Sequence, residues 1–138
     1  MTKTIFQETV FENTASSILY DTFLSSKHHS NIRGGMPADI QAVEGGIWNI
    51  NNGHLYGKIL KLVKDKLIVL SWRSGVTTVE EDLDMIVILH FCQSNKNTIV
   101  ELIHSLIPDE QRYEIYLKNW NERYWIPWKN YVNSLRQQ

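Results

Sequence analysis

The sequence predicts an α+β protein with an antiparallel sheet of about seven strands, short helices after the first strand and a long C-terminal helix. Apolar and polar residues alternate with a period of two from Thr2 to Phe11, and again over most of the chain between Pro37 and about residue 106. That period is typical of strands with one buried face. From Pro108 onward the apolar residues recur every three or four positions, which indicates an amphipathic helix.

The length and composition fit a single folded domain, which we expect to span residues 1–138. A chain of this length can bury about two-thirds of the surface that it exposes when unfolded. Its hydrophobic share of 43% and charged share of 21% are typical of a globular protein rather than a disordered one.

The charge and cysteine content argue against several classes of function. A net charge of −1, without a dense Lys/Arg cluster, makes nucleic acid an unsuitable partner. No apolar run approaches the roughly 18 to 20 residues of a membrane span, and the alternating N-terminus does not have the apolar block of a signal peptide. The single cysteine, Cys92, cannot form an internal disulfide, which agrees with a reducing compartment. We therefore predict a cytoplasmic protein without a membrane partner.

The segment after the first strand is predicted to be helical. Asn13 and Thr14 are suited to cap a helix, and Ile18, Leu19 and Phe23 follow at helical spacing. The next stretch, SSKHHSNIRGGMP, is polar and rich in glycine, and is predicted to be a short helix or a loop.

Three hairpins can be indexed from their turns. The dipeptide Asn52-Gly53 predicts a two-residue type I′ turn, which pairs Trp48 with Gly57. The missing side chain of the glycine leaves room for the indole ring.

The second hairpin continues the same face. A two-residue loop at Lys64-Asp65 places Ile59 opposite Leu70. Trp72 then lies on the apolar side as well, because side chains two residues apart in a strand share a face.

The third hairpin has two apolar faces. A turn at residues 94–95 pairs Phe91 with Thr98 and Met85 with His104. The outer face of an antiparallel sheet should be polar where it meets solvent, and here it carries isoleucines. Such a patch is typical of a surface for a dimer or another partner, unless a loop covers it or the indexing is shifted. The residues of this predicted interaction surface are Ile86, Ile88, Ile99 and Ile103.

The C-terminal helix is predicted to present an aromatic face. Asp109 and Glu110 occupy its first turn, where they favour the positive end of the helix dipole. A bend is expected at Pro127, which has no donor for the carbonyl four residues back. At about 100° per residue, one arc contains Tyr113, Tyr116, Leu117, Trp120, Tyr124, Trp128, Tyr131 and Leu135.

The order strand, helix, loop, six strands and long helix resembles the helix-grip fold of the START-like (SRPBCC) superfamily. Within it the chain resembles the family named for the activator of heat-shock protein 90 ATPase. The residues that carry the resemblance are Gly34-Gly35 before ADIQAVEGGIW, Tyr56-Gly57, Trp72-Arg73, the alternating stretch from Thr98 to His104, and Trp120 before YWIPWKNYV. The resemblance implies a curved sheet wrapped around the C-terminal helix, with a pocket between them.

The inner faces of the sheet and helix would line this pocket. Bulky aromatic side chains could equally fill the space, so a packed core and an open ligand cavity are both considered. The predicted pocket-lining residues are Trp48, Ile50, Leu55, Ile59, Leu70, Trp72, Met85, Val87, Leu89, Phe91, Val100, Leu102, His104, Trp120, Tyr124 and Trp128.

The resemblance implies two classes of function. The first is a non-enzymatic module, monomeric or homodimeric, that binds a hydrophobic or aromatic small molecule in the pocket, or the heat-shock protein 90 chaperone through its surface. The alternative is an enzyme of the polyketide cyclase or hydratase kind, acting on a hydrophobic substrate in the same pocket. No cofactor is expected. Arg33 and Arg73 are candidates to meet a ligand carboxylate at the pocket mouth, or else remain exposed.

The histidines give no sign of a catalytic or metal site. His104 is expected to point inward and to be satisfied by a backbone carbonyl rather than to act as a base, because Glu101 has the opposite strand parity. His90 is expected to point to the outer face of the sheet, so it cannot form a metal-binding pair with His104. His28 and His29 are adjacent in a polar stretch without a nearby carboxylate, and are expected to be solvated.

Overall fold

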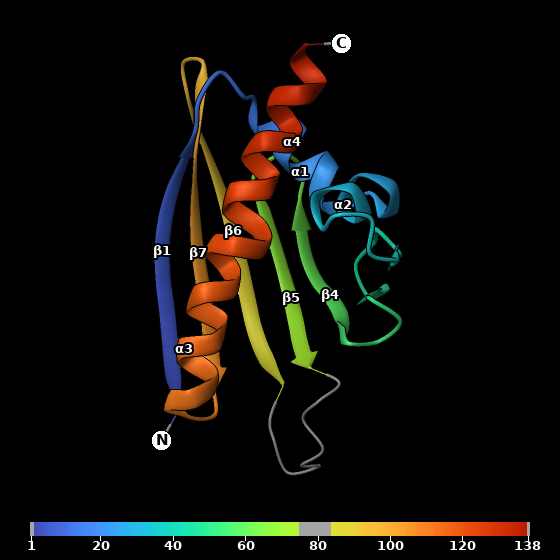
Figure 1. Cartoon of the computed structure of the whole chain (residues 1–138), viewed down its shortest axis with the longest axis vertical. Helices are drawn as coiled ribbons and strands as arrows, with labels where there is room; N and C mark the ends of the chain where they lie inside the picture. Colours follow the sequence, from blue (N-terminus) through green and yellow to red (C-terminus); the bar gives the residue numbers. More distant parts are fainter. Residues whose placement is uncertain (1, 75–83, 138) are drawn as a thin grey trace.

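The computed structural model describes residues 2–74 and 84–137, which form a seven-stranded antiparallel sheet with helices on one of its faces (Figure 1). The strand order is β1-β7-β6-β5-β4-β3-β2, so the first strand pairs with the last. The predicted fold class is confirmed. The strands are β1 (Lys3–Phe11), β2 (Ala38–Ile40), β3 (Ile47–Ile50), β4 (Leu55–Val63), β5 (Leu67–Ser74), β6 (Met85–Ser94) and β7 (Asn97–Ile107). The helices are α1 (Ser16–Leu24), α2 (Ser26–Ile32), α3 (Glu110–Asn119), the π-helical segment η1 (Trp120–Trp125) and α4 (Ile126–Arg136).

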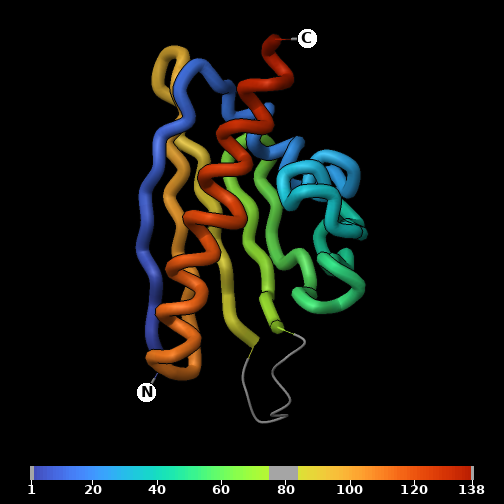
Figure 2. The backbone as a smooth tube through the Cα atoms, in the orientation of Figure 1, coloured from blue at the N-terminus to red at the C-terminus, as the bar shows by residue number. Residues whose placement is uncertain are grey.

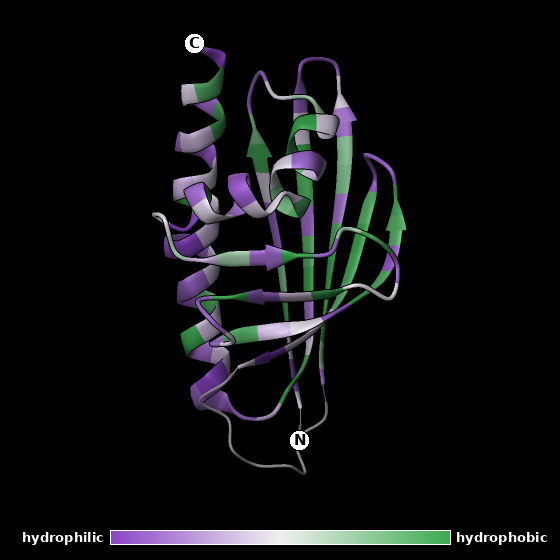
Figure 3. Cartoon of the chain, turned by 90° about the vertical axis from the view of Figure 1, so that its right-hand side faces the viewer, coloured by the Kyte–Doolittle hydropathy of each residue, from purple (hydrophilic) through white to green (hydrophobic). Residues whose placement is uncertain are grey.

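The helices share one side of the sheet. Figure 2 traces the C-terminal helix as one rod that runs diagonally across the sheet, from the ends of β1 and β7 towards α1. In the edge-on view of Figure 3, strands at the β2 end of the sheet run across the direction of those at the β1 end, so the sheet curves towards the helices. Within the described ranges no helix is both long and apolar enough to cross a membrane.

The inner face of the sheet is buried against this helix layer. Of the sheet residues predicted to face inward, Leu55 is partly buried and the others are buried. The C-terminal helix contributes Tyr116, Trp120, Tyr124, Trp125, Trp128 and Val132 to the same core.

The start of α1 differs from the prediction. Its N-cap residue is Ala15, which offers no side-chain cap, and the hydroxyl of Thr14 donates instead to the carbonyl of Glu12 at 2.8 Å. The cap comes from β6, where Oε1 of Gln93 accepts from the backbone N–H of Ser16 at 3.0 Å and from its hydroxyl at 3.1 Å. A residue far away in the sequence therefore satisfies this helix end.

The first hairpin has the predicted register, with Trp48 opposite Gly57. Asn52 and Gly53 have φ angles of 55° and 89°, as a type I′ turn requires. The indole N–H of Trp48 reaches across β4 and donates to the carbonyl of Ser71 on β5 at 3.1 Å. The glycine is needed for this contact, because a Cβ there would lie 2.0 Å from that carbonyl oxygen and 2.9 Å from the indole nitrogen.

The turn of the second hairpin contains three residues rather than two. Val63 pairs with Leu67, and Asp65 between them has a φ of 64°. The predicted pairing of Ile59 with Leu70 is still confirmed, because a bulge directly after Ile59 adds one residue to β4. The extra residue in the turn and the extra residue in the bulge have opposite effects on the register, so the pairing beyond the bulge is the predicted one.

The third hairpin is shifted by two residues from the predicted register. Phe91 pairs with Val100, and Val87 rather than Met85 pairs with His104, so the turn lies at residues 95–96. A shift of two changes every cross-strand partner but leaves each side chain on its predicted face, since side chains alternate with a period of two.

The C-terminal helix is continuous from Glu110 to Arg136, and it contains the π-helical segment η1 just before Pro127. Asp109 caps the helix by accepting from the backbone N–H of Arg112 at 2.8 Å. At the end of η1 the N–H of Ile126 bonds to the carbonyl of Asn121, five residues back. This wider turn comes directly before Pro127, which cannot donate a hydrogen bond.

The π-helical segment also changes which residues face the sheet. One extra residue in the turn rotates the following helix about its axis, and this brings Trp125 and Val132 into the core. Tyr131 and Leu135, which the uninterrupted period places on the inner arc, are only partly buried.

Replacement of Gly57 by alanine should destabilise the fold by about 2 to 3 kcal/mol, because the new methyl group collides with backbone that cannot move freely. Urea denaturation measures the free energy of unfolding. Lys58→Ala, at the next and exposed position, is the control and should change it by less than about 0.5 kcal/mol. Equal stability of the two variants would contradict the close packing described here.

Candidate functional site

The space between β3, β4, β5 and the helices α1 and α2 is a filled core. The cavity that remains there has a volume of about 10 Å³, which is about the space of one water molecule. A ligand of drug size needs about 300 Å³ or more. Of the two alternatives, a packed core and an open ligand cavity, this part of the interior is a packed core. The residues that line the cavity are Phe23, Leu24, His29, Ile40, Trp48, Ile59, Leu70 and Trp72.

A larger space lies between the end of β5, the turn before β4 and the first half of the C-terminal helix. A cavity of about 30 Å³ adjoins a crevice of about 280 Å³, and the two share Leu55, Tyr116 and Asn119 in their walls. We call these two adjoining spaces the aromatic crevice. Its inner part is lined by Arg33, Leu55, Trp72, Tyr116, Asn119, Trp120, Arg123 and Tyr124. Its outer part is lined by His54, Leu55, Ser74, Asp109, Gln111, Arg112, Ile115, Tyr116 and Asn119.

Four of the predicted pocket-lining residues line the aromatic crevice: Leu55, Trp72, Trp120 and Tyr124. Trp48, Ile59 and Leu70, together with Trp72, line the 10 Å³ cavity instead. The remaining residues are buried and line neither space: Ile50, Met85, Val87, Leu89, Phe91, Val100, Leu102, His104 and Trp128.

Aromatic rings form the inner wall of the crevice. The ring of Trp120 lies 5.5 Å from that of Trp72 and 4.8 Å from that of Tyr124, centroid to centroid. Trp72 comes from the end of β5, and the other two come from η1. The π-helical turn thus places two consecutive inward-facing rings against a strand-end tryptophan.

The indole nitrogens distinguish Trp72 from the other tryptophans. Trp48 donates to Ser71, Trp120 to His104, Trp125 to Gln7 and Trp128 to Thr22, at distances between 2.7 and 3.1 Å. The indole N–H of Trp72 is buried and has no hydrogen-bond partner within the described parts of the chain. A buried donor without an acceptor costs about 1 to 3 kcal/mol, so an acceptor from outside the protein would be favoured there.

His104 is buried, and its contacts correct the predicted one. Its Nδ1 accepts from the indole N–H of Trp120 at 2.9 Å rather than donating to a backbone carbonyl. The proton therefore lies on Nε2, which has no partner within residues 2–74 and 84–137. Burial lowers the pKa of His104 to about 3, so the ring is neutral at physiological pH. The basic lone pair on Nδ1 already accepts the hydrogen bond from Trp120, so His104 is poorly placed to take a proton from a substrate.

His29 is buried, in contrast to the solvated position expected for it. Its Nδ1 donates to the carbonyl of Phe23 at 2.6 Å, and its Nε2 accepts from the hydroxyl of Tyr124 at 3.0 Å. That hydroxyl accepts in turn from Arg33 at 3.0 Å, and the guanidinium stacks on the tyrosine ring at 4.9 Å. Burial lowers the pKa of His29 to about 4. The chain of contacts fixes Arg33 in the wall of the crevice.

The other predicted candidates lie elsewhere. His28 is on α2 and contacts the hydroxyl of Tyr131 through its Nδ1. Arg73 forms an ion pair with Asp84. A second surface groove of about 280 Å³ lies between the end of β1 and α4, where the side chain of Arg136 bonds to the backbone of the loop before α1. These contacts are structural links between elements.

The outer face of the sheet carries the predicted isoleucines, each partly exposed. The edge strand β1 extends this apolar face with Phe6, which is 73% exposed, and Val10, which is 45% exposed. Phe6 pairs with Ile103 and Val10 with Ile99. We call these six residues the outer apolar surface: Phe6, Val10, Ile86, Ile88, Ile99 and Ile103.

Acidification should destabilise the fold through His29 and His104. Both are held neutral by burial, whereas a histidine in the unfolded chain titrates near about 6.5. Below that pH the unfolded state binds more protons, so the stabilisation is complete above pH 6.5 and is lost as the pH falls towards the two folded-state pKa values. We expect the free energy of unfolding to drop by about 2 kcal/mol per histidine between pH 7.5 and 5.

Urea denaturation at the two pH values measures this change. His104→Gln should retain about half of the pH dependence, because His29 remains. Equal stability of the unmodified chain at both pH values would show that neither histidine is held neutral.

Comparison with known proteins gives structural relatives of low sequence identity. An HSP90 activator from Plasmodium falciparum is 20% identical and superposes with a TM-score of 0.73, covering 90% of this chain and 89% of that one. The Aha1 dimer from Colwellia psychrerythraea is 13% identical, with a TM-score of 0.70 and coverage of 96% and 92%. A protein from Mesorhizobium loti is 15% identical, with a TM-score of 0.79 and coverage of 96% and 98%. No curated protein matches the sequence.

These similarities show the START-like helix-grip fold, and the sequence identifies the family. Residues 13–127 match the family described as "Activator of Hsp90 ATPase homolog 1-like protein". The match includes most of the sheet, the aromatic crevice and the start of α4. The chain therefore belongs to the family of activator of Hsp90 ATPase homolog 1-like proteins.

Proposed function

We propose that the protein is a non-enzymatic START-like binding module, and that the aromatic crevice binds a small aromatic compound with an acceptor oxygen. The observation that carries the proposal is the indole N–H of Trp72, a buried donor without a partner in the described chain, in the wall of this crevice. An acceptor oxygen of the ligand would restore the missing hydrogen bond.

The shape and chemistry of the crevice limit the ligand. The outer part of the crevice, at about 280 Å³, is at the lower limit for drug-sized molecules, which favours a compound with one or two rings over a sterol. The inner part has only about 30 Å³, so it would receive one end of the compound. The rings of Trp72, Trp120 and Tyr124 line this inner part and would contact the apolar edge of the compound that reaches it. Arg33, in the same wall, favours a carboxylate as the acceptor group.

The enzymatic alternative of the cyclase or hydratase kind has less support. His104, the inward-facing titratable residue predicted from the sequence, has its basic nitrogen occupied by Trp120 and does not line the crevice. A proton-transfer group must be within hydrogen-bond reach of the substrate. A binding role makes no such demand.

Replacement of Trp72 by phenylalanine should weaken binding of a single-ring aromatic acid by roughly tenfold, because the ring is kept and one hydrogen bond to a charged group is lost. Tryptophan fluorescence and the shift in melting temperature, over a panel of benzoic and phenylacetic acids, measure the affinity. Trp125→Phe is the matched control, since its indole donates to Gln7 away from the crevice. Equal affinities of the three proteins, or no binding by any of them, would contradict the proposal.

A second candidate function is regulation of an Hsp90-type chaperone through the outer apolar surface. The family match and the structural relative described as an HSP90 activator support it. The outer apolar surface adds an observation from this chain, because exposed apolar side chains gathered on one face of a protein often mark an interaction site. Phe6, at 73% exposure, is the most accessible of these six residues and the natural anchor for a chaperone.

Addition of the protein to the Hsp90 chaperone of the same organism should form a complex in gel filtration and change the rate of ATP hydrolysis. Phe6→Ser should weaken the complex by about tenfold or more, as expected when an aromatic anchor is removed. Ile126→Ser, which changes an exposed apolar residue of α4, should not. Absence of a complex at high micromolar concentration would remove this candidate and leave the ligand proposal standing.

A further inference from the structure

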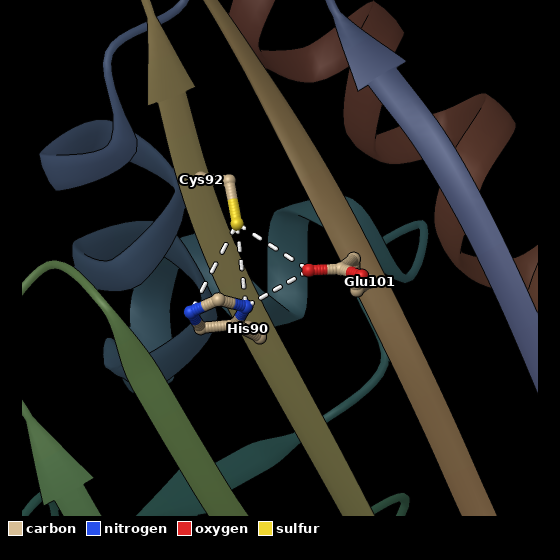
Figure 4. Close-up of side chains that lie close together, drawn as sticks. All are labelled: His90, Cys92 and Glu101. Carbon is tan, nitrogen blue, oxygen red and sulfur yellow. Dashed lines mark hydrogen bonds and ion pairs between the residues drawn. The ribbon is translucent and has the colours of Figure 1, made fainter.

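Three side chains of different metal-binding types converge on the outer face of the sheet, opposite the face that packs on the helices (Figure 4). His90 and Cys92 are two residues apart on β6, so they project from the same face. Glu101 lies directly across from His90 on β7. Figure 4 shows the imidazole, the thiol and the carboxylate turned towards one another.

The distances within this cluster are close to those of a metal site. Nδ1 of His90 lies 2.9 Å from Oε1 of Glu101 and 3.2 Å from Sγ of Cys92, and the sulfur lies 3.4 Å from the same carboxylate oxygen. Tetrahedral zinc with bonds of about 2.0 to 2.3 Å requires ligand atoms roughly 3.3 to 3.6 Å apart. A cation about 1 Å above the plane of the three atoms would be about 2.1 Å from each of them. Shifts of a few tenths of an ångström complete the geometry.

The charges around the cluster favour a cation as well. Glu8 on β1 is the direct cross-strand partner of Glu101, so it adds a second acidic residue to this face. Like charges opposite each other destabilise a sheet, and a divalent cation between them removes the repulsion.

From this geometry we infer that His90, Cys92 and Glu101 form a binding site for a divalent transition metal of the zinc type, with water as the fourth ligand. Sulfur and imidazole ligands select zinc and its neighbours over magnesium or calcium, which prefer oxygen alone. The thiol releases its proton to solvent when the metal binds, and no electron is transferred.

An activated cysteine nucleophile fits the same residues less well. In a nucleophilic pair the base bonds to the thiol through one ring nitrogen and to an orienting carboxylate through the other. Here Nδ1 of His90 is the close contact of both the thiol and Glu101. Burial and the two carboxylates, Glu101 and Glu8, also raise the pKa of the thiol, which opposes a thiolate unless a metal is present.

The test is a titration of the untagged, reduced protein with Co²⁺ and then Zn²⁺. One equivalent of Co²⁺ should give a thiolate-to-cobalt charge-transfer band in the near ultraviolet and the visible bands of a tetrahedral ion, and Zn²⁺ should displace it. Zn²⁺ should also raise the melting temperature by mass action. Cys92→Ser should abolish the charge-transfer band. His90→Ala and Glu101→Gln should each weaken binding at least about tenfold, because loss of even an outer partner of a metal site costs that much.

Glu122→Gln is the matched control for Glu101→Gln, as it removes an exposed carboxylate from η1 and should leave the spectrum and affinity unchanged. The three cluster residues lie on the surface or near it, and circular dichroism verifies that each variant is folded. No charge-transfer band in a protein with one titratable thiol would overturn the inference. An unchanged affinity in both His90→Ala and Glu101→Gln would overturn it equally.

Discussion

The interaction on which the rest of the structure depends is the contact between the aromatic face of the C-terminal helix and the inner face of the sheet. Three indoles of this helix donate to three different elements: Trp125 to β1, Trp120 to β7 and Trp128 to α1. These bonds fix the helix in its rotation and along its axis, since a shift in either breaks all three. The π-helical segment makes the arrangement feasible. It ends just before Pro127, which cannot donate a hydrogen bond, and it brings Trp125 into the core. There the ring of Trp125 stacks between those of Trp120 and Trp128.

At the other edge of the sheet, the packing of a tryptophan depends on a glycine. The indole of Trp48 lies over Gly57 and bonds to Ser71, so three strands are joined by one side chain. That ring also contacts the ring of Trp72 at 4.7 Å, which fills the space that the curvature of the sheet would otherwise leave open. The filled interior is thus a consequence of the same residues that carry the family resemblance. Among the described residues, the space that adjoins this aromatic layer lies at the end of β5, where the indole N–H of Trp72 has no partner.

Periodicity predicted the faces of this sheet better than its pairing. Side chains alternate strictly, so the residues predicted to face the helix do so even though the third hairpin is shifted by two. The cross-strand partners depend on turn geometry, which the sequence around residues 94–96 left ambiguous. The shift concealed the cluster of His90, Cys92 and Glu101, because the predicted register places Ile99 rather than Glu101 opposite His90. The burial of His29 and the cap from Gln93 depend on contacts distant in sequence, and no local pattern indicates them.

The two faces of the sheet now carry different chemistry, and the difference has a physical origin. The inner face is shielded from water, so its polar side-chain atoms need partners within the protein. The exceptions on this face are the indole nitrogen of Trp72 and Nε2 of His104, and an unpaired donor is costly in a core. The outer face has no such constraint, since water can satisfy any group there. Apolar side chains such as Phe6, and acidic residues at paired positions such as Glu8 and Glu101, are not explained by stability of the isolated chain. Features that folding does not require are the ones that point to function, and on this protein they are concentrated on the outer face and at the end of β5.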